Sequence, residues 1–187
     1  MTAVKAALTT PFPKLANELG EVLKLFCTVE AFSVNREESV PGFLPLLHTF
    51  SREGNHCVCG FSFLGHTCRE ESDLPRVEPE RQALVDKRLI KRLCKLTLYT
   101  LLKRETGRQP PWGSLTGIRP TRLLYEKLAE GLTMEQAAEA LETVFDVTPE
   151  KTALLREIVA VQLTLPQPRP EEADLYVSIP FCRTRCA

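Results

Sequence analysis

The chain has 187 residues, 43% of them hydrophobic, and its 24 basic side chains are balanced by 24 acidic ones. A formal charge of zero gives no overall attraction to nucleic acid or to an anionic membrane, and no apolar run approaches the roughly 20 residues of a transmembrane helix. Seven cysteines, an odd number, fit a reducing cytoplasm better than a disulfide framework. We therefore expect a cytoplasmic protein without a nucleic-acid or membrane partner, with one ordinary domain and room for part of another.

The amino-terminal half predicts one helix and a β-hairpin. Apolar residues recur at three- and four-residue steps over 13–27, as they do on one face of a helix. Two extended runs follow at about 42–50 and 56–64, and residues 51–55 between them contain the glycine and asparagine that a tight turn favours. Residues 66–78 are polar and contain proline, so we expect a loop there.

A long helix is predicted from about 79 to 106, with Gly107 as its stop. Apolar residues supply one side of this helix, and basic residues occupy the other. The basic residues are Arg81, Lys87, Arg88, Lys91, Arg92, Lys95, Lys103, Arg104 and Arg108. They permit two interpretations: a surface for an anionic partner, or a solvated face whose aliphatic stems cover apolar surface, which we favour.

Three shorter helices are predicted after a loop at 109–120. The first begins at Pro120, where a proline suits the first turn, and ends near Gly131. The second begins with the capping-box sequence at 133–136. The third begins at Thr148, a residue type that caps helices, and is followed by a proline.

A proline-rich segment after these helices sets the predicted domain boundary. Three prolines within residues 166–170 indicate a stiff, extended linker. We therefore divide the chain into an α+β accessory domain at 1–165, built from a β-hairpin and several helices, a linker at 166–173, and the start of a second domain at 174–187.

The last segment carries the leading candidate site. A strand-like run closed by Pro180 leads to Cys182 and Cys186 at C-x-x-x-C spacing. The neighbouring Arg183 and Arg185 favour the thiolate form, which is the form that binds metal. Because thiolates are the usual ligands of iron–sulfur clusters, we predict that Cys182 and Cys186 are metal ligands, with inert thiols as the alternative.

Two blocks of sequence resemble a known family. The run Leu175-Tyr-Val-Ser-Ile-Pro-Phe-Cys-Arg-Thr-Arg-Cys-Ala187 resembles the opening of the catalytic domain of oxygen-independent coproporphyrinogen III oxidases (dehydrogenases), which are radical S-adenosylmethionine (radical SAM) enzymes. The block Trp112-Gly-Ser-Leu-Thr-Gly-Ile-Arg-Pro-Thr-Arg-Leu-Leu124, with shorter matches at 134–137 and 156–159, resembles the HemZ-like branch of that family.

The resemblance implies a [4Fe–4S] cluster, S-adenosyl-L-methionine and a porphyrinogen substrate. By position, Cys182 and Cys186 match the first two ligands of the family's C-x-x-x-C-x-x-C motif, and Tyr176 matches a tyrosine that contacts the cofactor. Residues 174–187 would then be the first strand of a (β/α) barrel. The implied activity of the parent protein is the oxidative decarboxylation of coproporphyrinogen III to protoporphyrinogen IX in porphyrin and haem biosynthesis.

The printed chain holds two of the motif's three cysteines. We therefore expect it to be truncated inside the cluster motif, to bind neither cofactor stably and to be inactive by itself, and we assign it no catalytic residue. Two alternatives remain open for its function: a haem chaperone of the same radical-SAM family, or a stand-alone binding module that uses the basic helix.

A second group of metal-ligand residue types lies at His56, Cys57 and Cys59, with His66 and Cys68 nearby. These residues suit zinc by type, but strand alternation offers another explanation. Alternate residues of a strand face one side of its sheet, which would place the first two cysteines with phenylalanines in a core. We favour buried cysteines. His48, for which the sequence names no partner, is expected to be a strand or turn residue.

The loop from Trp112 to Arg119 also permits two interpretations. Two glycines and a guanidinium are able to cradle a carboxylate of a substrate or cofactor. The alternative, which we favour, is a structural loop in which the glycines make turns. In that case we expect Arg119 to bind helix carbonyl groups or an acidic residue such as Glu126 or Glu130.

Overall fold

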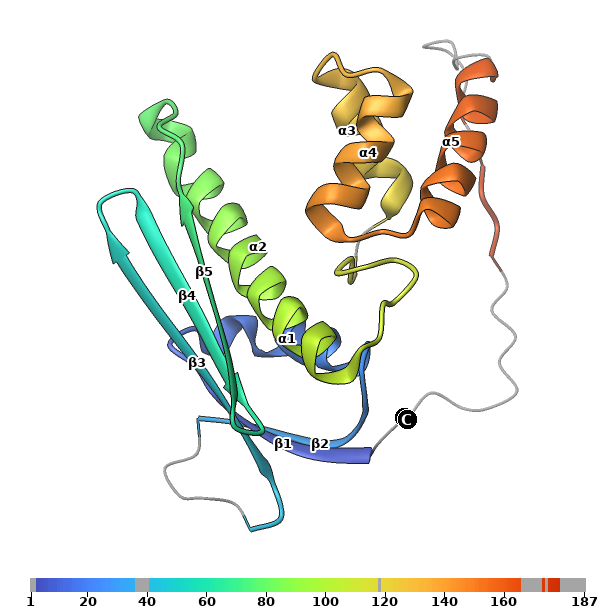
Figure 1. The fold of residues 1–187 in the computed structure, drawn as a ribbon. Coiled ribbons are helices and arrows are strands. Elements are labelled where there is room, and N and C mark those ends of the chain that lie inside the picture. Colours follow the sequence, from blue (N-terminus) through green and yellow to red (C-terminus); the bar gives the residue numbers. More distant parts are fainter. Residues whose placement is uncertain (1–2, 36–40, 118, 166–172, 174, 179–187) are drawn as a thin grey trace.

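The structure is a computed structural model that describes residues 3–35, 41–117, 119–165, 173 and 175–178. It has a five-stranded sheet with two helices, followed by three further helices (Figure 1). The α+β fold with a β-hairpin and several helices is therefore confirmed for the described residues. The hairpin proves to be part of a larger mixed sheet.

The sheet has the strand order β2-β1-β3-β4-β5. Its strands are β1 (Ala3–Thr9), β2 (Thr28–Val34), β3 (Leu44–Glu53), β4 (His56–Phe63) and β5 (His66–Asp73). Strand β1 runs parallel to both β2 and β3, while β3, β4 and β5 form an antiparallel meander. The predicted hairpin is therefore confirmed as β3 and β4.

The parallel pair β1 and β2 was not predicted. Helix α1 (Ala16–Lys24), preceded by the 3-10 turn Pro13–Leu15, connects the two strands. Strand β1 buries Val4, Ala6 and Leu8 on alternate positions, which is the pattern of a half-buried strand. The helix expected over 13–27 is confirmed over its central part.

Strand β5 corrects the loop expected at 66–78. It pairs with β4 from His66 opposite Phe63 to Asp73 opposite His56. Cys68 is the one residue of β5 that is buried. The periodic apolar signal is therefore missing, because β5 is an edge strand, and polar or charged side chains on an edge discourage pairing with another chain.

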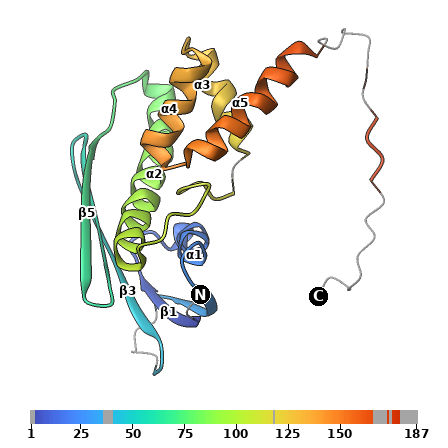
Figure 2. The ribbon, with the colours of Figure 1, turned by 45° about the vertical axis from the view of Figure 1, so that its right-hand side comes forward.

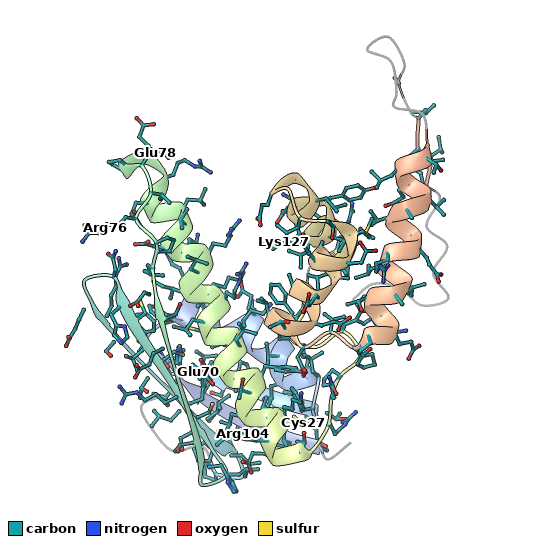
Figure 3. All side chains as sticks on the ribbon, turned by 45° about the horizontal axis from the view of Figure 1, so that its top comes forward. Cys27, Glu70, Arg76, Glu78, Arg104 and Lys127 are labelled. Carbon is teal, nitrogen blue, oxygen red and sulfur yellow. The ribbon has the colours of Figure 1, made fainter. Side chains whose placement is uncertain are left out.

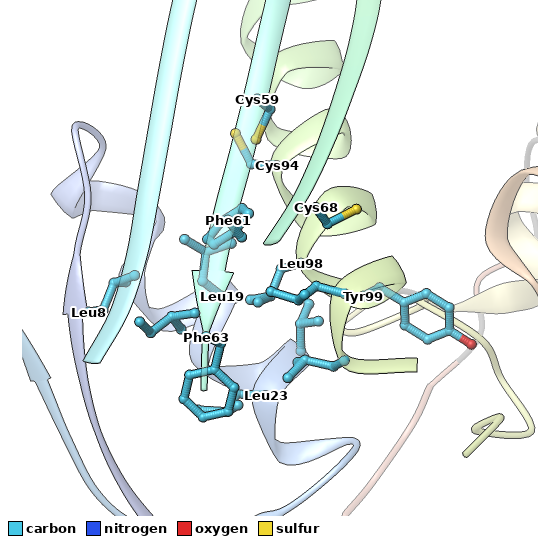
Figure 4. Close-up of a cluster of buried hydrophobic side chains, with 14 of the residues drawn as sticks. Leu8, Leu19, Leu23, Cys59, Phe61, Phe63, Cys68, Cys94, Leu98 and Tyr99 are labelled. Carbon is cyan, nitrogen blue, oxygen red and sulfur yellow. The ribbon is translucent and has the colours of Figure 1, made fainter. Parts of the chain in front are cut away.

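Helices α1 and α2 cover the same face of the sheet (Figure 2). Helix α2 (Pro79–Thr106) has the predicted bounds, and Gly107 ends it in a left-handed conformation. Its buried residues meet β4, where Cys57, Cys59, Phe61 and Phe63 all face inward (Figure 4). The prediction of buried cysteines in a strand is therefore confirmed.

The three remaining helices surround a second, separate core. They are α3 (Pro120–Ala129), α4 (Met134–Phe145) and α5 (Pro149–Thr164). Their core contains Leu124, Leu141 and Leu155, with Leu115 from the preceding loop. The predicted capping box is confirmed, because Thr133 and Gln136 each bind the other's backbone N–H.

Thr148 stands at the position before α5, as predicted, but its side chain has another function. Its hydroxyl donates a hydrogen bond to the Pro111 carbonyl (3.2 Å), and its backbone N–H donates to the same oxygen (3.1 Å). The start of α5 is therefore attached to the loop that precedes α3.

The domain boundaries at 165–166 and 173–174 stay predictions, because most of residues 166–187 lie outside the described part of the chain. The described residues 175–178 have no regular secondary structure, and the strand predicted there is not tested by so short a piece. Within the described ranges, no helix is both long and apolar enough to span a membrane.

The loop before α3 offers a test of the packing between it and α4. Gly113 has φ +55°, and a Cβ there would overlap the Phe145 carbonyl, whereas Gly117 has φ +66° with no atom within 4 Å of such a Cβ. We expect Gly113→Ala to lower the free energy of unfolding by roughly 2–5 kcal/mol, from backbone strain and overpacking together. Gly117→Ala should lower the free energy of unfolding through backbone strain alone, by about 1–2 kcal/mol. Urea denaturation followed by circular dichroism measures both, and equal losses would contradict the packing.

Candidate functional site

A cleft of about 820 Å³ separates α2 from the loop and helices that follow it. Figure 3 shows side chains of α2 and of α3, where Lys127 is labelled, extending into the space between these helices. The α2 wall consists of Arg88, Lys91, Arg92, Lys95 and Leu96. The opposite wall consists of Ser114, Leu115, Gly117, Arg119, Thr121, Arg122, Leu123, Tyr125, Glu126, Phe145 and Gln162.

The cleft is strongly basic in a chain whose total formal charge is zero. Six of the lining residues are lysines or arginines, and one, Glu126, is acidic. Four of these cations lie at three- and four-residue steps along α2, so they project from one face of the helix. The other two, Arg119 and Arg122, face them across the cleft.

Most of these cations lack a carboxylate partner. Lys91 pairs with Glu18 of α1 (2.5 Å), and Arg122 pairs with Glu126 (3.2 Å). Within the described ranges, the remaining four form no ion pair. These four are Arg88, Arg92, Lys95 and Arg119. An anionic ligand would therefore meet cations that are not already neutralised.

Two of the α2 cations are partly removed from water. Burial lowers the pKa of Lys95, and the nearby Lys91 lowers that pKa further. Burial likewise lowers the pKa of Arg92, whose guanidinium lies 5.2 Å from the centroid of the Phe145 ring. Desolvated cations attract an anion more strongly than solvated ones do, because less water screens the charges.

The structure shows where the basic residues of the long helix lie. Four of the nine basic residues line a cleft with a second wall; of these, Arg88 is exposed and the other three are partly buried. Others have structural contacts: Lys103 binds Asp146, and Arg108 donates to the Phe26 carbonyl (3.1 Å). Both interpretations of the basic helix therefore stay predictions for the four cleft residues.

The loop from Trp112 to Arg119 is attached to α4, as the structural interpretation predicts, and it also lines the cleft. The Ser114 backbone N–H and hydroxyl both donate to the Phe145 carbonyl, at 2.8 and 3.2 Å, which fixes the loop to α4. Gly117 and Arg119 line the cleft. The expected partners of Arg119 are bound elsewhere, because Glu126 pairs with Arg122 and Glu130 pairs with Lys127.

A partly buried polar contact holds α2 against the end of α4. Asp146 accepts hydrogen bonds on one carboxylate oxygen from the Tyr99 hydroxyl and from the Lys103 amine, both at 2.6 Å. Gln109 donates to the other oxygen (3.1 Å). Because α2 and α4 both contribute to the cleft, this contact fixes the distance between its walls.

The residues predicted as cofactor and metal ligands are not brought together by the described part of the structure. Cys182 and Cys186 lie outside the described residues. Tyr176 is described and is exposed, at 88% of its surface. His56 and His66 are also exposed and contact carboxylates of Asp73 and Glu105.

A different group, which sequence reasoning missed, meets in the core between the sheet and α2. It consists of His48, Cys59 and Cys94, all buried. His48 was expected to be a strand residue, and it lies in β3, but it has partners that the sequence did not name. No local motif signals this group, since its members come from three separate elements.

The comparisons with known proteins agree with the expected branch. The chain is 40% identical to "Oxygen-independent coproporphyrinogen-III oxidase-like protein HemZ" of Bacillus subtilis (strain 168) over 101 residues. Over this segment the chain is similar to HemZ. The match covers 52% of the chain but 20% of the relative, so the chain spans about a fifth of that protein's length. No family model matches the chain, and no solved structure matches it.

The contact of Tyr99 with Asp146 gives a test of how firmly the walls of the cleft are held. Tyr99→Phe removes a partly buried hydrogen bond to a charged group, so we expect the free energy of unfolding to fall by about 1.5–3 kcal/mol. The matched control is Tyr125→Phe, which removes an exposed hydrogen bond to Gln162 (3.3 Å) and should cost less. Thermal and urea denaturation measure both, and equal effects would contradict a specific role of Tyr99.

The stability difference between the wild type and Tyr99→Phe has an expected pH dependence. Burial, and then Asp146, raise the pKa of Tyr99. As the pH rises through the ordinary tyrosine pKa of about 10, the unfolded chain loses the Tyr99 proton while the folded chain retains it, so stability falls. Above that pH we expect the free energy of unfolding to fall more steeply in the wild type than in Tyr99→Phe, and parallel curves would contradict this.

Proposed function

We propose that this chain is part of a cytoplasmic, HemZ-like coproporphyrinogen III oxidase of the radical-SAM class. The observation that carries the proposal is the 40% identity to HemZ over 101 residues. The proposed activity of the whole protein is the oxidative decarboxylation of a porphyrinogen in porphyrin and haem biosynthesis. Free thiols at all five described cysteines support a reducing compartment.

In this proposal, Cys182 and Cys186 would hold an iron–sulfur cluster and Tyr176 would contact S-adenosyl-L-methionine. When bound, these cofactors would supply the radical that starts substrate oxidation. The donor set within the chain is two thiolates, which do not by themselves complete a three-thiolate site. No step of the radical reaction is therefore assigned to the residues of this chain.

We infer that the basic cleft receives the carboxylates of the porphyrinogen. Its volume of about 820 Å³ is that of a small-molecule site. Its lining combines apolar residues, such as Leu96, Leu115 and Phe145, with cations on both walls. Apolar surface suits a tetrapyrrole ring, and lysine and arginine suit its propionates.

Porphyrin binding tests this assignment directly. Trp112, the single tryptophan of the chain, reports binding of coproporphyrin III, a stable oxidised form of the substrate, by fluorescence quenching. We expect Arg92→Gln and Lys95→Gln each to weaken binding roughly tenfold, which is about 1.4 kcal/mol. The matched control is Lys87→Gln, which removes an exposed cation of α2 outside the cleft and should leave the affinity unchanged.

Three further measurements separate the alternatives. The tetramethyl ester of coproporphyrin lacks the negative charges and should not bind if the cations recognise propionates. Because burial lowers the pKa of Lys95, the affinity should fall as the pH rises toward that lowered pKa and the amine loses its charge. Tighter binding of haem than of coproporphyrin III would favour the haem-chaperone alternative, and equal binding of the ester would overturn the assignment.

A further inference from the structure

Three metal-ligand side chains converge in the core beneath α2. They are His48 of β3, Cys59 of β4 and Cys94 of α2, and one ligand atom from each lies within 4.8 Å of the other two. The Cys59 Sγ is 3.4 Å from the His48 Nε2. Figure 4 shows the sulfur atoms of Cys59 and Cys94 next to each other. The group is sealed from solvent, since His48 is 2% exposed and both cysteines are fully buried.

The imidazole of this group is held in one orientation. Its Nδ1 lies 2.8 Å from the Thr10 hydroxyl oxygen, and its ring stacks on Phe61 with centroids 4.2 Å apart. The Thr10 oxygen accepts one hydrogen bond from the Phe12 N–H, which leaves a lone pair for a proton on Nδ1. That tautomer leaves Nε2 free, facing the sulfur atoms. A hydrogen bond at the second nitrogen is the usual support of a metal-binding histidine.

The charge of the group favours a cation. The two sulfur atoms and the imidazole lie within 4.8 Å of one another in a part of the core that excludes water. A thiolate buried without a full opposite charge is costly. Loss of the thiol protons of Cys59 and Cys94 to solvent when a divalent cation binds would leave two thiolates and a neutral imidazole around it, which gives a site of zero net charge.

We propose that His48, Cys59 and Cys94 form a zinc site that joins β3, β4 and α2. Two thiolates and an imidazole match the preferences of zinc, and sites with three protein ligands keep a fourth position for a small oxygen ligand. Two Zn–S bonds and one Zn–N bond form, and the protons of the two thiols leave to solvent.

This site is separate from the proposed porphyrin cleft. Cys94 faces the sheet, whereas the neighbouring Lys95 lines the cleft, so the two sites use different faces of α2. The zinc proposal therefore does not depend on the porphyrin assignment, and either of them can fail while the other holds.

Metal analysis of the purified chain tests the proposal. Every protein in this experiment also carries Cys182→Ser and Cys186→Ser, so that zinc bound by the C-x-x-x-C pair does not contribute to the measurement. We expect about one zinc ion per chain after growth with added zinc. Cobalt(II) in its place should give the thiolate charge-transfer absorption of a tetrahedral sulfur site. Cys59→Ser and Cys94→Ser should lose both signals.

Cys57→Ser is the matched control. Cys57 is fully buried, faces the same side of β4 as Cys59 and is not part of the group. It should retain zinc, although it removes a core thiol just as Cys59→Ser does. Loss of zinc in Cys57→Ser to the same extent as in Cys59→Ser would show that the metal signal follows core integrity, and this would overturn the assignment.

A measurement on the chain that retains His48, Cys59 and Cys94 covers the case in which the Cys59→Ser and Cys94→Ser variants do not fold. Ligand binding to the folded state raises stability by mass action, so a zinc chelator should lower the melting temperature and added zinc should restore it. A chain that contains no zinc and whose melting temperature is unchanged by chelator and by added zinc would overturn the proposal. Isolation of a Cys59–Cys94 disulfide under the same conditions would also overturn it.

Discussion

Every other part of this structure depends on the packing of α2 against the sheet. The helix buries Leu98, Leu101 and Leu102 on the strands, and each fully buried leucine contributes on the order of 2 kcal/mol. A helix with one side fixed in a core must present its other side outward. That outward side carries the four cations, so the core packing also determines where the positive charges of the cleft point.

The second wall of the cleft is positioned by contacts of a different kind. The carboxylate of Asp146, at the end of α4, binds Tyr99 and Lys103 of α2, and the Phe145 carbonyl binds Ser114 of the loop. These polar contacts join two separate apolar cores. The cleft therefore lies where polar contacts between the two cores replace continuous apolar packing, which leaves space for a ligand between charged walls.

The sequence predicted those elements whose apolar residues recur over many positions. Helix α2 was predicted from apolar residues that recur over many turns, and its end was predicted from Gly107. The capping box was predicted from the side-chain types at Thr133 and Gln136. Strand β1 was missed because its signal rests on few residues, two of which, Val4 and Ala6, are small. Strand β5 was missed because Cys68 alone is buried in it. Its place depends on pairing with β4, which no local pattern encodes.

The candidate sites were also predicted only in part from the sequence. The basic residues of α2 are visible in the sequence, but the cleft also requires Arg119 and Arg122, which tertiary folding brings opposite to them. His48, Cys59 and Cys94 come from two strands and a helix, and side-chain spacing along the chain does not connect them. Sequence patterns report one element at a time, whereas both sites are formed between elements.

The distribution of cysteine and tryptophan between the two cores has a practical consequence. All five described cysteines, Cys27 and Cys94 among them, belong to the core under the sheet, whereas Trp112, the single tryptophan, packs against the core of α3–α5. A thiol reagent reaches these cysteines only when the first core opens, while indole emission follows the second. The chain thus carries a separate natural reporter in each half, and the two together tell whether the halves unfold as one cooperative unit.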